Sequence, residues 1–577
     1  MHKYTIKKLL AYLRPYSFLL IVSILLGLIN VASNLVLPYL FGKSIDLIVG
    51  VNDVNYTKLK TYALYLLIII FVAAIAQWIM SFIHNTVTYR VIRDIRNNAF
   101  TKLEHLPLSY IDSHQTGELV NNIITDTEQL GEGLYMTFTQ FFTGVLTILG
   151  VIGFMFAINL WISLFVIVLT PLSFIIAKWI SKNSYDSFKK QSIERGNQTS
   201  MIDEFIGNQK VIQSLKYEDD ASLRFEEQNE KLANISLKAT FISSLVNPST
   251  RFINAIIYAG VALIGGIIIL NTTDVLTIGL LSTLLGYSSQ YSKPFNEITG
   301  VITELQNALA CGNRIFKLLD EVLEIDNGNE VLRTNVGNIN INNVSFSYTP
   351  EQKLIENFNL EVKKGEHIAI VGPTGCGKTT MINLLMRFYD VNKGEILLDG
   401  ININNLSKQN LREHYGMVLQ DTWLKNGTIR ENITMNKEYS IEAINDVINK
   451  TKLNYLISSL PKGLDTVLSE NGGNLSAGQK QLISIARVML KNSDILILDE
   501  ATSNIDTRTE LIVQNAFLEL MQNKTSFIVA HRLSTIKNAD KIIVMNNGSI
   551  IEIGSHEELL AKKGFYYTLF NAQFQTK

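Results

Sequence analysis

The chain has 577 residues, a formal net charge of −1 and 47% hydrophobic residues. This length exceeds that of a single domain, so two or more domains are expected. The near-neutral charge implies no general attraction to nucleic acid. The only two cysteines, Cys311 and Cys376, lie in separate regions, which excludes a disulfide framework. The mean hydropathy of +0.17 is high for a soluble enzyme.

The first half of the chain contains long apolar runs. They cover residues 15–42, 61–89, 133–177, 252–273 and 275–292. The third run is long enough for two spanning helices joined by a turn near Asn159, so six spans are predicted. A single run would also fit a buried helix of a soluble protein, but six in one half favour a membrane domain. The basic stretch 1–14 is predicted to be an interfacial helix rather than a cleaved signal peptide.

Lysine and arginine are unevenly distributed between the segments that join these runs. The N-terminal arm and residues 90–105 and 178–238 are rich in both, whereas the turns near Asn159 and at 271–274 have neither. The positive-inside rule therefore places the N-terminus, and everything after the sixth span, in the cytoplasm.

Two cytoplasmic segments, 90–132 and 178–238, combine helical periodicity with mixed charge. They are predicted to continue the spans as polar helices. Each has room for a short bend, near 109–119 and near 211–217, that touches a cytoplasmic domain. Solvated helices without a partner fit the same pattern, and the sequence leaves both readings open.

Arg251 precedes a strongly apolar run. If it lies at membrane depth, its charge is expected to face a cavity or a partner. If the span begins later, Arg251 is an interface anchor whose side chain reaches the water. Both readings remain open.

The second half begins near Asn338 with the strand, turn and helix patterns of an α/β domain. Its centre is a glycine-rich loop between an apolar strand, 367–371, and a helix-like run, 381–386, which is the context of a phosphate-binding loop. The predicted nucleotide-binding residues of this loop are Gly372, Pro373, Thr374, Gly375, Cys376, Gly377, Lys378, Thr379 and Thr380. The glycines let backbone N–H groups point at phosphate oxygens. Lys378 supplies a positive charge for the β- and γ-phosphates of ATP, and Thr379 supplies a ligand for Mg²⁺.

A second apolar strand pattern, 494–500, ends in two carboxylates, Asp499 and Glu500. The continuous apolar pattern predicts a central parallel strand. Asp499 is expected to hold the Mg²⁺ shell. Glu500 points the other way along the strand and is predicted to orient, or take a proton from, an attacking water.

Leu475-Ser-Ala-Gly-Gln479, followed by residues 480–487, resembles the signature of ATP-binding cassette (ABC) ATPases. Together with the two motifs above, this resemblance is very specific and covers essentially the whole chain. Further matches are Tyr348 to the aromatic residue that stacks on adenine, Gln420 to the Q-loop, residues 503–506 to the D-loop, His531 to the switch histidine, Glu470 to the Glu before the signature, and 116–119 to the first coupling helix. Six spans ahead of such a cassette look like an exporter-type half-transporter of the multidrug and lipid family.

The resemblance implies a role for each matching residue. Tyr348 would offer its ring to adenine, and Gln420 would sense Mg²⁺ and the γ-phosphate. Ser476, Gly478 and Gln479 begin a helix whose N–H groups would bind the γ-phosphate. His531 would hydrogen-bond the same phosphate, so Glu500 and His531 are the predicted catalytic residues. The predicted metal site is made by Thr379, Gln420 and Asp499.

In this family the signature of one cassette closes over the phosphate loop of another, so a second half-transporter is the expected partner. ATP joins the two cassettes, hydrolysis releases them, and the membrane helices alternate in access. Two residues depart from the family pattern, Ala477 where Gly is usual and Asn504 where Ala is usual. A methyl group at 477 is tolerable if the backbone there is helical. These departures favour a heterodimer over a homodimer, with this chain supplying the competent acid Glu500.

The predicted fold is thus a multi-domain membrane protein: an all-α transmembrane domain of six helices (1–307), a linker (308–337) and an α/β phosphate-loop cassette (338–577). The predicted function is ATP-driven export of amphipathic drugs, lipids or peptides across the cell membrane. The helical domain is expected to lie in the lipid bilayer and the cassette in the cytoplasm. No nucleic-acid partner is expected. Uptake through an exporter fold and an ATP-gated channel remain alternatives. A soluble DNA-repair ATPase is disfavoured by the six apolar runs.

Overall fold

The computed structural model describes residues 2–48, 54–271, 276–332, 336–349, 354–420, 422–469, 472–499, 506–529 and 536–574. The chain divides into two compact units. A helical unit comprises Met1–His105 and Gln115–Glu321, and an α/β unit comprises Leu106–His114 and Val322–Lys577. The short segment 106–114 therefore packs with the second unit, although the sequence on both of its sides belongs to the first.

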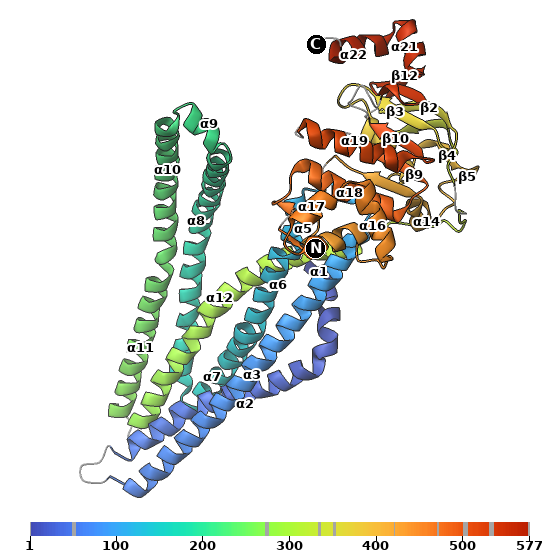
Figure 1. Cartoon of the computed structure of the whole chain (residues 1–577). Helices are drawn as coiled ribbons and strands as arrows, with labels where there is room; N and C mark the ends of the chain where they lie inside the picture. The colour runs from blue at the N-terminus through green and yellow to red at the C-terminus, as the bar shows by residue number, and fades with distance from the viewer. Residues whose placement is uncertain are drawn as a thin grey trace. The chain divides into compact units, whose positions relative to one another are not determined.

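The helical unit is built of long helices and a few short helical segments between them (Figure 1). In chain order they are α1 (His2–Leu13), the short 3₁₀ turn η1 (Arg14–Tyr16), α2 (Ser17–Asp46), α3 (Tyr56–Glu104), α5 (Thr116–Ile123), α6 (Thr125–Met136), the π-helical turn η2 (Thr137–Phe141), α7 (Phe142–Ile158), α8 (Leu160–Gly207), α9 (Gln209–Ser214), α10 (Glu218–Ser244), α11 (Val246–Asn271) and α12 (Ile278–Asp320).

Apart from short connections, the described parts of the predicted apolar runs lie in these helices. Among the described residues, four stretches are long and apolar enough to cross a membrane: Lys3–Asp46, Tyr56–Glu104, Thr116–Ile158 and Glu218–Asn271. A fifth, Leu160–Leu172 in α8, is apolar but shorter, and the sixth run lies in α12. The predicted turn near Asn159 is present: Asn159 has an extended backbone between α7 and α8, and its side chain caps α8 by accepting a bond from the N–H of Ile162.

The polar extensions of the spans are helical, as predicted. α3 continues to Glu104, α8 continues to Gly207, and α10 leads back from Glu218. Both predicted bends contain short helices: α4 (Leu108–Asp112) and the start of α5 in the first, and α9 in the second. Arg251 lies in the second turn of α11 with an exposed side chain. The predicted linker 308–337 begins inside α12, which continues to Asp320.

The α/β unit contains all the strands described. They are β1 (Ile339–Phe346), β2 (Ile355–Val362), β3 (His367–Val371), β4 (Lys393–Leu398), β5 (Ile401–Asn402), β6 (Tyr415–Val418), β7 (Gly427–Thr428), β8 (Val467–Leu468), β9 (Ile495–Asp499), β10 (Thr525–Val529), β11 (Lys541–Asn546) and β12 (Ser549–Gly554). Besides α4, its helices are α13 (Lys378–Leu385), α14 (Lys408–Glu413), α15 (Ile429–Thr434), α16 (Ile441–Lys450), α17 (Asn454–Ser459), the 3₁₀ turn η3 (Gly463–Asp465), α18 (Ala477–Lys491), α19 (Thr507–Met521), α21 (His556–Lys562) and α22 (Phe565–Phe574).

The main sheet has the strand order β12-β11-β3-β10-β9-β6. Every neighbouring pair is parallel except β11 with β12. Strands β3, β9 and β10 are almost wholly buried, which explains their continuous apolar sequences. Because parallel strands end at one edge, the carboxyl ends of β3, β6, β9 and β10 lie together there. A second, antiparallel sheet of order β2-β1-β4-β5 carries Tyr348 just beyond the end of β1.

Candidate nucleotide site

The glycine-rich loop joins β3 to α13. Gly375 and Gly377 have φ angles of 82° and 103°, a left-handed region that residues with a Cβ rarely adopt. Cys376 between them is buried, and its carbonyl accepts a bond from the N–H of Gly548 at 3.1 Å. The loop is thus held from behind by the turn between β11 and β12. On its other side, the loop leads into the N-terminus of α13, where free N–H groups favour the binding of an anion.

Lys378 is the first residue of α13. Its ammonium group donates to the carbonyls of Gly372 at 2.7 Å and Pro373 at 3.0 Å. These bonds fold the side chain back over its own loop, so the positive charge lies beside the N-terminus of the helix. Both the charge and the helix end attract a phosphate to the same place.

A pocket of about 510 Å³ opens beside this loop. Its lining includes nine of the predicted site residues: Tyr348, Thr374, Gly375, Gly377, Lys378, Thr379, Thr380, Gln420 and Asp499. Leu354 and Val529 complete the lining. The sequence did not single them out, because an apolar residue at a strand end carries no chemical signal. Gly372, Pro373 and Cys376 shape the loop without lining the pocket.

Tyr348 stands at one side of the pocket. Its hydroxyl donates to Thr380 Oγ1 at 3.3 Å and accepts from Asn383 Nδ2 at 3.3 Å, which ties it to α13. Its ring packs edge-to-face on Phe346 and Tyr389, each at 5.0 Å between centroids. The side chain is still 42% exposed, so the ring retains surface on which a planar base can stack.

Gln420 and Asp499 come from neighbouring strands. In the ladder between β6 and β9, Val418 pairs with Leu498. Asp499 is the last residue of β9, and Gln420 lies two residues beyond the end of β6, so both are at the same edge of the sheet. Together with the Thr379 hydroxyl, these side chains offer amide and carboxylate oxygens, the ligand types that Mg²⁺ prefers. Glu470, Glu500, His531 and the D-loop residues 503–505 lie outside the described residues.

The signature residues form a helix start elsewhere in the α/β unit. Ser476 caps α18 in a capping box: Ser476 Oγ accepts from the N–H of Gln479 at 3.3 Å, and Gln479 Oε1 accepts from the N–H of Ser476 at 2.9 Å. Ala477 is the first helical residue and is exposed, so its methyl group fits, as expected. Ser476, Gly478 and Gln479 do not line the pocket of their own chain.

The segment 106–114 meets the α/β unit next to the Tyr348 ring. Tyr389, which packs against that ring, donates from its hydroxyl to a carboxylate oxygen of Asp112 at 2.6 Å. Burial of the phenol, and then this bond, raise the pKa of Tyr389 above its ordinary value. The hydroxyl therefore remains a donor throughout the physiological pH range. Residues 106–114, which overlap the first predicted bend, are part of the α/β unit, whereas 116–119 begin α5 in the helical unit.

A phosphate loop at the edge of a parallel sheet, combined with long apolar helices, defines the class of membrane proteins that use ATP for transport. The family model described as the ABC transporter transmembrane region matches residues 20–295, and the model described as ABC transporter matches residues 355–503. The chain belongs to the ABC transporter family.

Individual relatives agree with this assignment. The chain is 37% identical over 91% of its length, and 84% of the other's, to a fatty acid ABC transporter ATP-binding/permease protein of Mycobacterium bovis. It is 34% identical over 99% of its length, and 98% of the other's, to an ATP-dependent lipid A-core flippase of Idiomarina loihiensis. A solved bacterial Atm1-family ABC exporter with ATP bound is similar with a TM-score of 0.77 and 28% identity, over 98% of this chain and 99% of that one.

The predicted fold class and family are therefore confirmed. The protein is a multi-pass membrane protein of the exporter type that binds ATP and couples its hydrolysis to transport. It carries one transmembrane region and one cassette, and half-transporters of this kind work as dimers.

Proposed function

We propose that the protein exports amphipathic molecules, such as lipids, drugs or peptides, by alternating access. The part of this proposal that concerns ATP binding rests on the pocket that brings Tyr348, Lys378, Gln420 and Asp499 together. Adenine stacks on Tyr348, the phosphates lie on the loop and Lys378, and Mg²⁺ takes oxygens from Thr379, Gln420 and Asp499. Glu500 orients the attacking water, and His531 bonds the γ-phosphate.

The cargo class rests on the names of the relatives, which refer to fatty acid, lipid A-core and multidrug transport. These molecules share an apolar body with a polar end. The apolar runs of the helical unit suit such molecules better than small hydrophilic solutes.

The partner is a second half-transporter. Ser476, Gly478 and Gln479 do not line the pocket of their own chain, which supports our proposal that a partner's signature helix completes it. Ala477 and Asn504 favour a heterodimer. At the bend between α8 and α10, Val211 and Leu215 expose 52% and 72% of their surface. We infer that this apolar tip docks on the partner's cassette.

The cassette, residues 338–577, and the N-terminus lie in the cytoplasm in this proposal, with residues 1–307 as the transmembrane domain. The support is the distribution of Lys and Arg, which are concentrated on the segments at that side.

Transport by reconstituted protein tests the proposal. In liposomes with the cassettes facing outward, ATP should drive a fluorescent fatty acid or a cationic dye into the lumen. Lys378→Ala should abolish this accumulation, whereas Lys393→Ala, an exposed lysine on β4 of the same unit, should leave it intact. Equal accumulation with Lys378→Ala would refute the site. ATP-driven depletion of the lumen would instead support uptake, and ATP-gated flux that dissipates a gradient would support a channel.

A further inference from the structure

The first helix of the chain, α1, is strongly basic. Together with the turn η1 it carries the cationic residues Lys3, Lys7, Lys8 and Arg14, and the sequence has no acidic residue before position 46. Lys8 is paired, because its ammonium group lies 2.5 Å from a carboxylate oxygen of Asp320. Lys3, Lys7 and Arg14 are exposed, and none of them has an acidic partner among the described residues. Their charge is therefore available to a partner outside the chain.

The other side of α1 is attached to the helical unit. Leu9 is buried, and Tyr12 stacks on Phe316 of α12 at 6.1 Å between ring centroids. The ion pair of Lys8 adds a polar contact to Asp320, which is the last residue of α12. These contacts fix which side of α1 packs on the protein and which side faces outward.

The outward side of α1 combines the unpaired cations with apolar side chains. With 3.6 residues per turn, this side of the helix and its continuation into η1 fall within an arc of roughly 100°. We call it the basic face, and its residues are Lys3, Ile6, Lys7, Leu10 and Arg14. Ile6 and Leu10 are 43% and 59% exposed. A helix side that faces water alone is polar throughout, whereas lysines next to exposed apolar residues are typical of a helix in a membrane interface.

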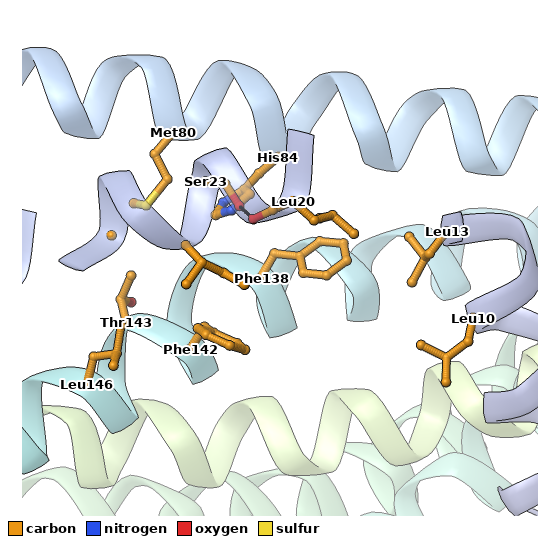
Figure 2. Close-up of a pocket in the computed structure, with 12 residues that line it drawn as sticks. Leu10, Leu13, Leu20, Ser23, Met80, His84, Phe138, Phe142, Thr143 and Leu146 are labelled. Atoms are coloured by element: carbon orange, nitrogen blue, oxygen red, sulfur yellow. Dashed lines mark hydrogen bonds between the residues drawn. The ribbon is translucent and has the colours of Figure 1, made fainter. Parts of the chain in front are cut away.

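The place of α1 in the chain puts the basic face at the membrane surface. The charge-free run 15–42 begins directly after Arg14, so the chain enters the hydrocarbon layer there. Figure 2 shows Leu10 and Leu13 of α1 at one end of an apolar pocket in the helical unit, with Met80 of α3 farther along it. The apolar side chains of α1 are therefore continuous with the apolar part of the spans, while the cations remain at the level of the lipid headgroups.

We propose that the basic face of α1 is a docking site for anionic phospholipids. Their phosphate groups lie at Lys3, Lys7 and Arg14, and Ile6 and Leu10 contact the upper part of the acyl chains. Unpaired cations at a membrane surface select lipids that carry a net negative charge over zwitterionic lipids. A soluble anion would leave the two apolar side chains in water, so the occupant is a lipid rather than free phosphate. The proposal rests on the membrane location of the chain and not on its cargo or direction of transport.

Photo-crosslinking with two matched lipids tests the proposal. The full chain is placed in phosphatidylcholine nanodiscs that contain a trace of either phosphatidylglycerol or phosphatidylcholine with a diazirine near the headgroup. Peptide mass spectrometry then measures the labelling of residues 1–16. Each lysine near an anionic membrane surface contributes roughly a fivefold preference, so phosphatidylglycerol should label this segment at least about tenfold more strongly than phosphatidylcholine. Lys3→Gln combined with Lys7→Gln leaves only Arg14 unpaired and should lower the preference to about fivefold or less.

Lys58→Gln combined with Lys60→Gln is the matched control. Both lysines are exposed and lie in the first turns of α3, and this variant should keep the wild-type preference. ATP binding serves as the fold check for each variant.

Three outcomes would overturn the proposal. One is equal labelling of wild type by the two lipids. Another is an unchanged preference after Lys3→Gln with Lys7→Gln, or an equal loss in the control. The third is competition by inorganic phosphate beyond that of chloride at the same ionic strength, which would indicate an anion site rather than a lipid site. None of these results depends on transport, so a failure of this proposal is distinct from a failure of the proposed export function.

Discussion

The Tyr389 hydroxyl donates a 2.6 Å hydrogen bond to the Asp112 carboxylate, although 277 positions separate the two residues in the sequence. Tyr389 follows α13, which begins at the phosphate loop, and its ring packs edge-to-face on Tyr348. Asp112 ends α4 within the segment that joins α3 to α5. The bond therefore connects the surroundings of Tyr348, the residue predicted to stack on adenine, to the segment that joins α3 to α5.

Tyr389→Phe should reduce transport without reducing ATP binding. The variant keeps the ring contacts with Phe346 and Tyr348 and removes only the bond to Asp112. Because this carboxylate is exposed, the bond stabilises the contact by only about 1 kcal/mol. This energy corresponds to roughly a fivefold change in the equilibrium between the formed and the broken contact. Substrate-stimulated ATPase activity should fall by about that factor, while the Kd for ATP stays unchanged.

Tyr415→Phe is the matched control for this experiment. Tyr415 is a buried tyrosine of the same unit whose hydroxyl has no hydrogen-bond partner among the described residues. Removing that hydroxyl should leave activity and stability intact. An equal loss of activity in both variants would show that the Asp112 bond has no special role.

The sequence predicted the parts of the fold that depend on local pattern. The apolar strand 367–371, the glycines after it and Lys378 lie next to each other in the chain, so their arrangement follows from neighbouring residues. The break at Asn159 was also predictable, because a charge-free run too long for one span has to turn. The family resemblance added Tyr348 and Gln420, and both line the pocket with Lys378 and Asp499.

Other features depend on contacts between distant residues and leave no local signal. Tyr389 is one aromatic residue among many until the fold brings it to Asp112. Leu354, just before β2, and Val529, at the end of β10, are ordinary apolar residues until the loop approaches them. The polar content after Ala308 indicated a linker that contains a helix at 314–321, and in the structure this stretch is the end of α12, which runs unbroken to Asp320. Ala308, Ile315 and Phe316 are buried in the helical unit, and this burial is not visible in the local sequence.

Glu500→Gln should retain ATP binding and lose most hydrolysis. In our proposal Glu500 orients the water and accepts its proton, and removal of such a base costs roughly 10² to 10⁴ in rate. The mutant should accumulate as an ATP-bound dimer, which size-exclusion chromatography with ATP and Mg²⁺ can detect. Wild-type turnover in this mutant would overturn the assigned role.

Leu215→Asp should uncouple ATP hydrolysis from substrate transport. Leu215 directly follows α9 and is 72% exposed, so a carboxylate there leaves the folded chain stable but opposes burial against a partner's cassette. Basal ATP hydrolysis should persist while substrate transport falls at least tenfold. Leu223→Asp, an exposed leucine on α10, is the control. Equal transport by the two variants would remove the support for α9 as a docking element.

Glu324→Gln should destabilise the α/β unit in a pH-dependent way. Glu324 precedes β1 and accepts bonds from Arg412 at 2.8 and 3.2 Å and from Lys408 at 3.1 Å. Burial alone would raise the pKa of Glu324, but these cationic donors outweigh burial and hold it below its ordinary value. Bonds of this type contribute about 2 kcal/mol, so the thermal midpoint of the full chain should fall by about 5 °C at neutral pH.

The pH dependence follows from the direction of that shift. A carboxylate whose pKa is lowered by folding stabilises the native state fully above its unfolded value, about 4.3, and loses this contribution as the pH falls through the folded value. The difference in midpoint between wild type and Glu324→Gln should therefore be constant from about pH 8 to about pH 5.5 and should shrink below about pH 4. Scanning calorimetry on both proteins, with Glu438→Gln as an exposed control, measures it. A difference that grows on acidification would mean that Glu324 is not the charged anchor of Lys408 and Arg412.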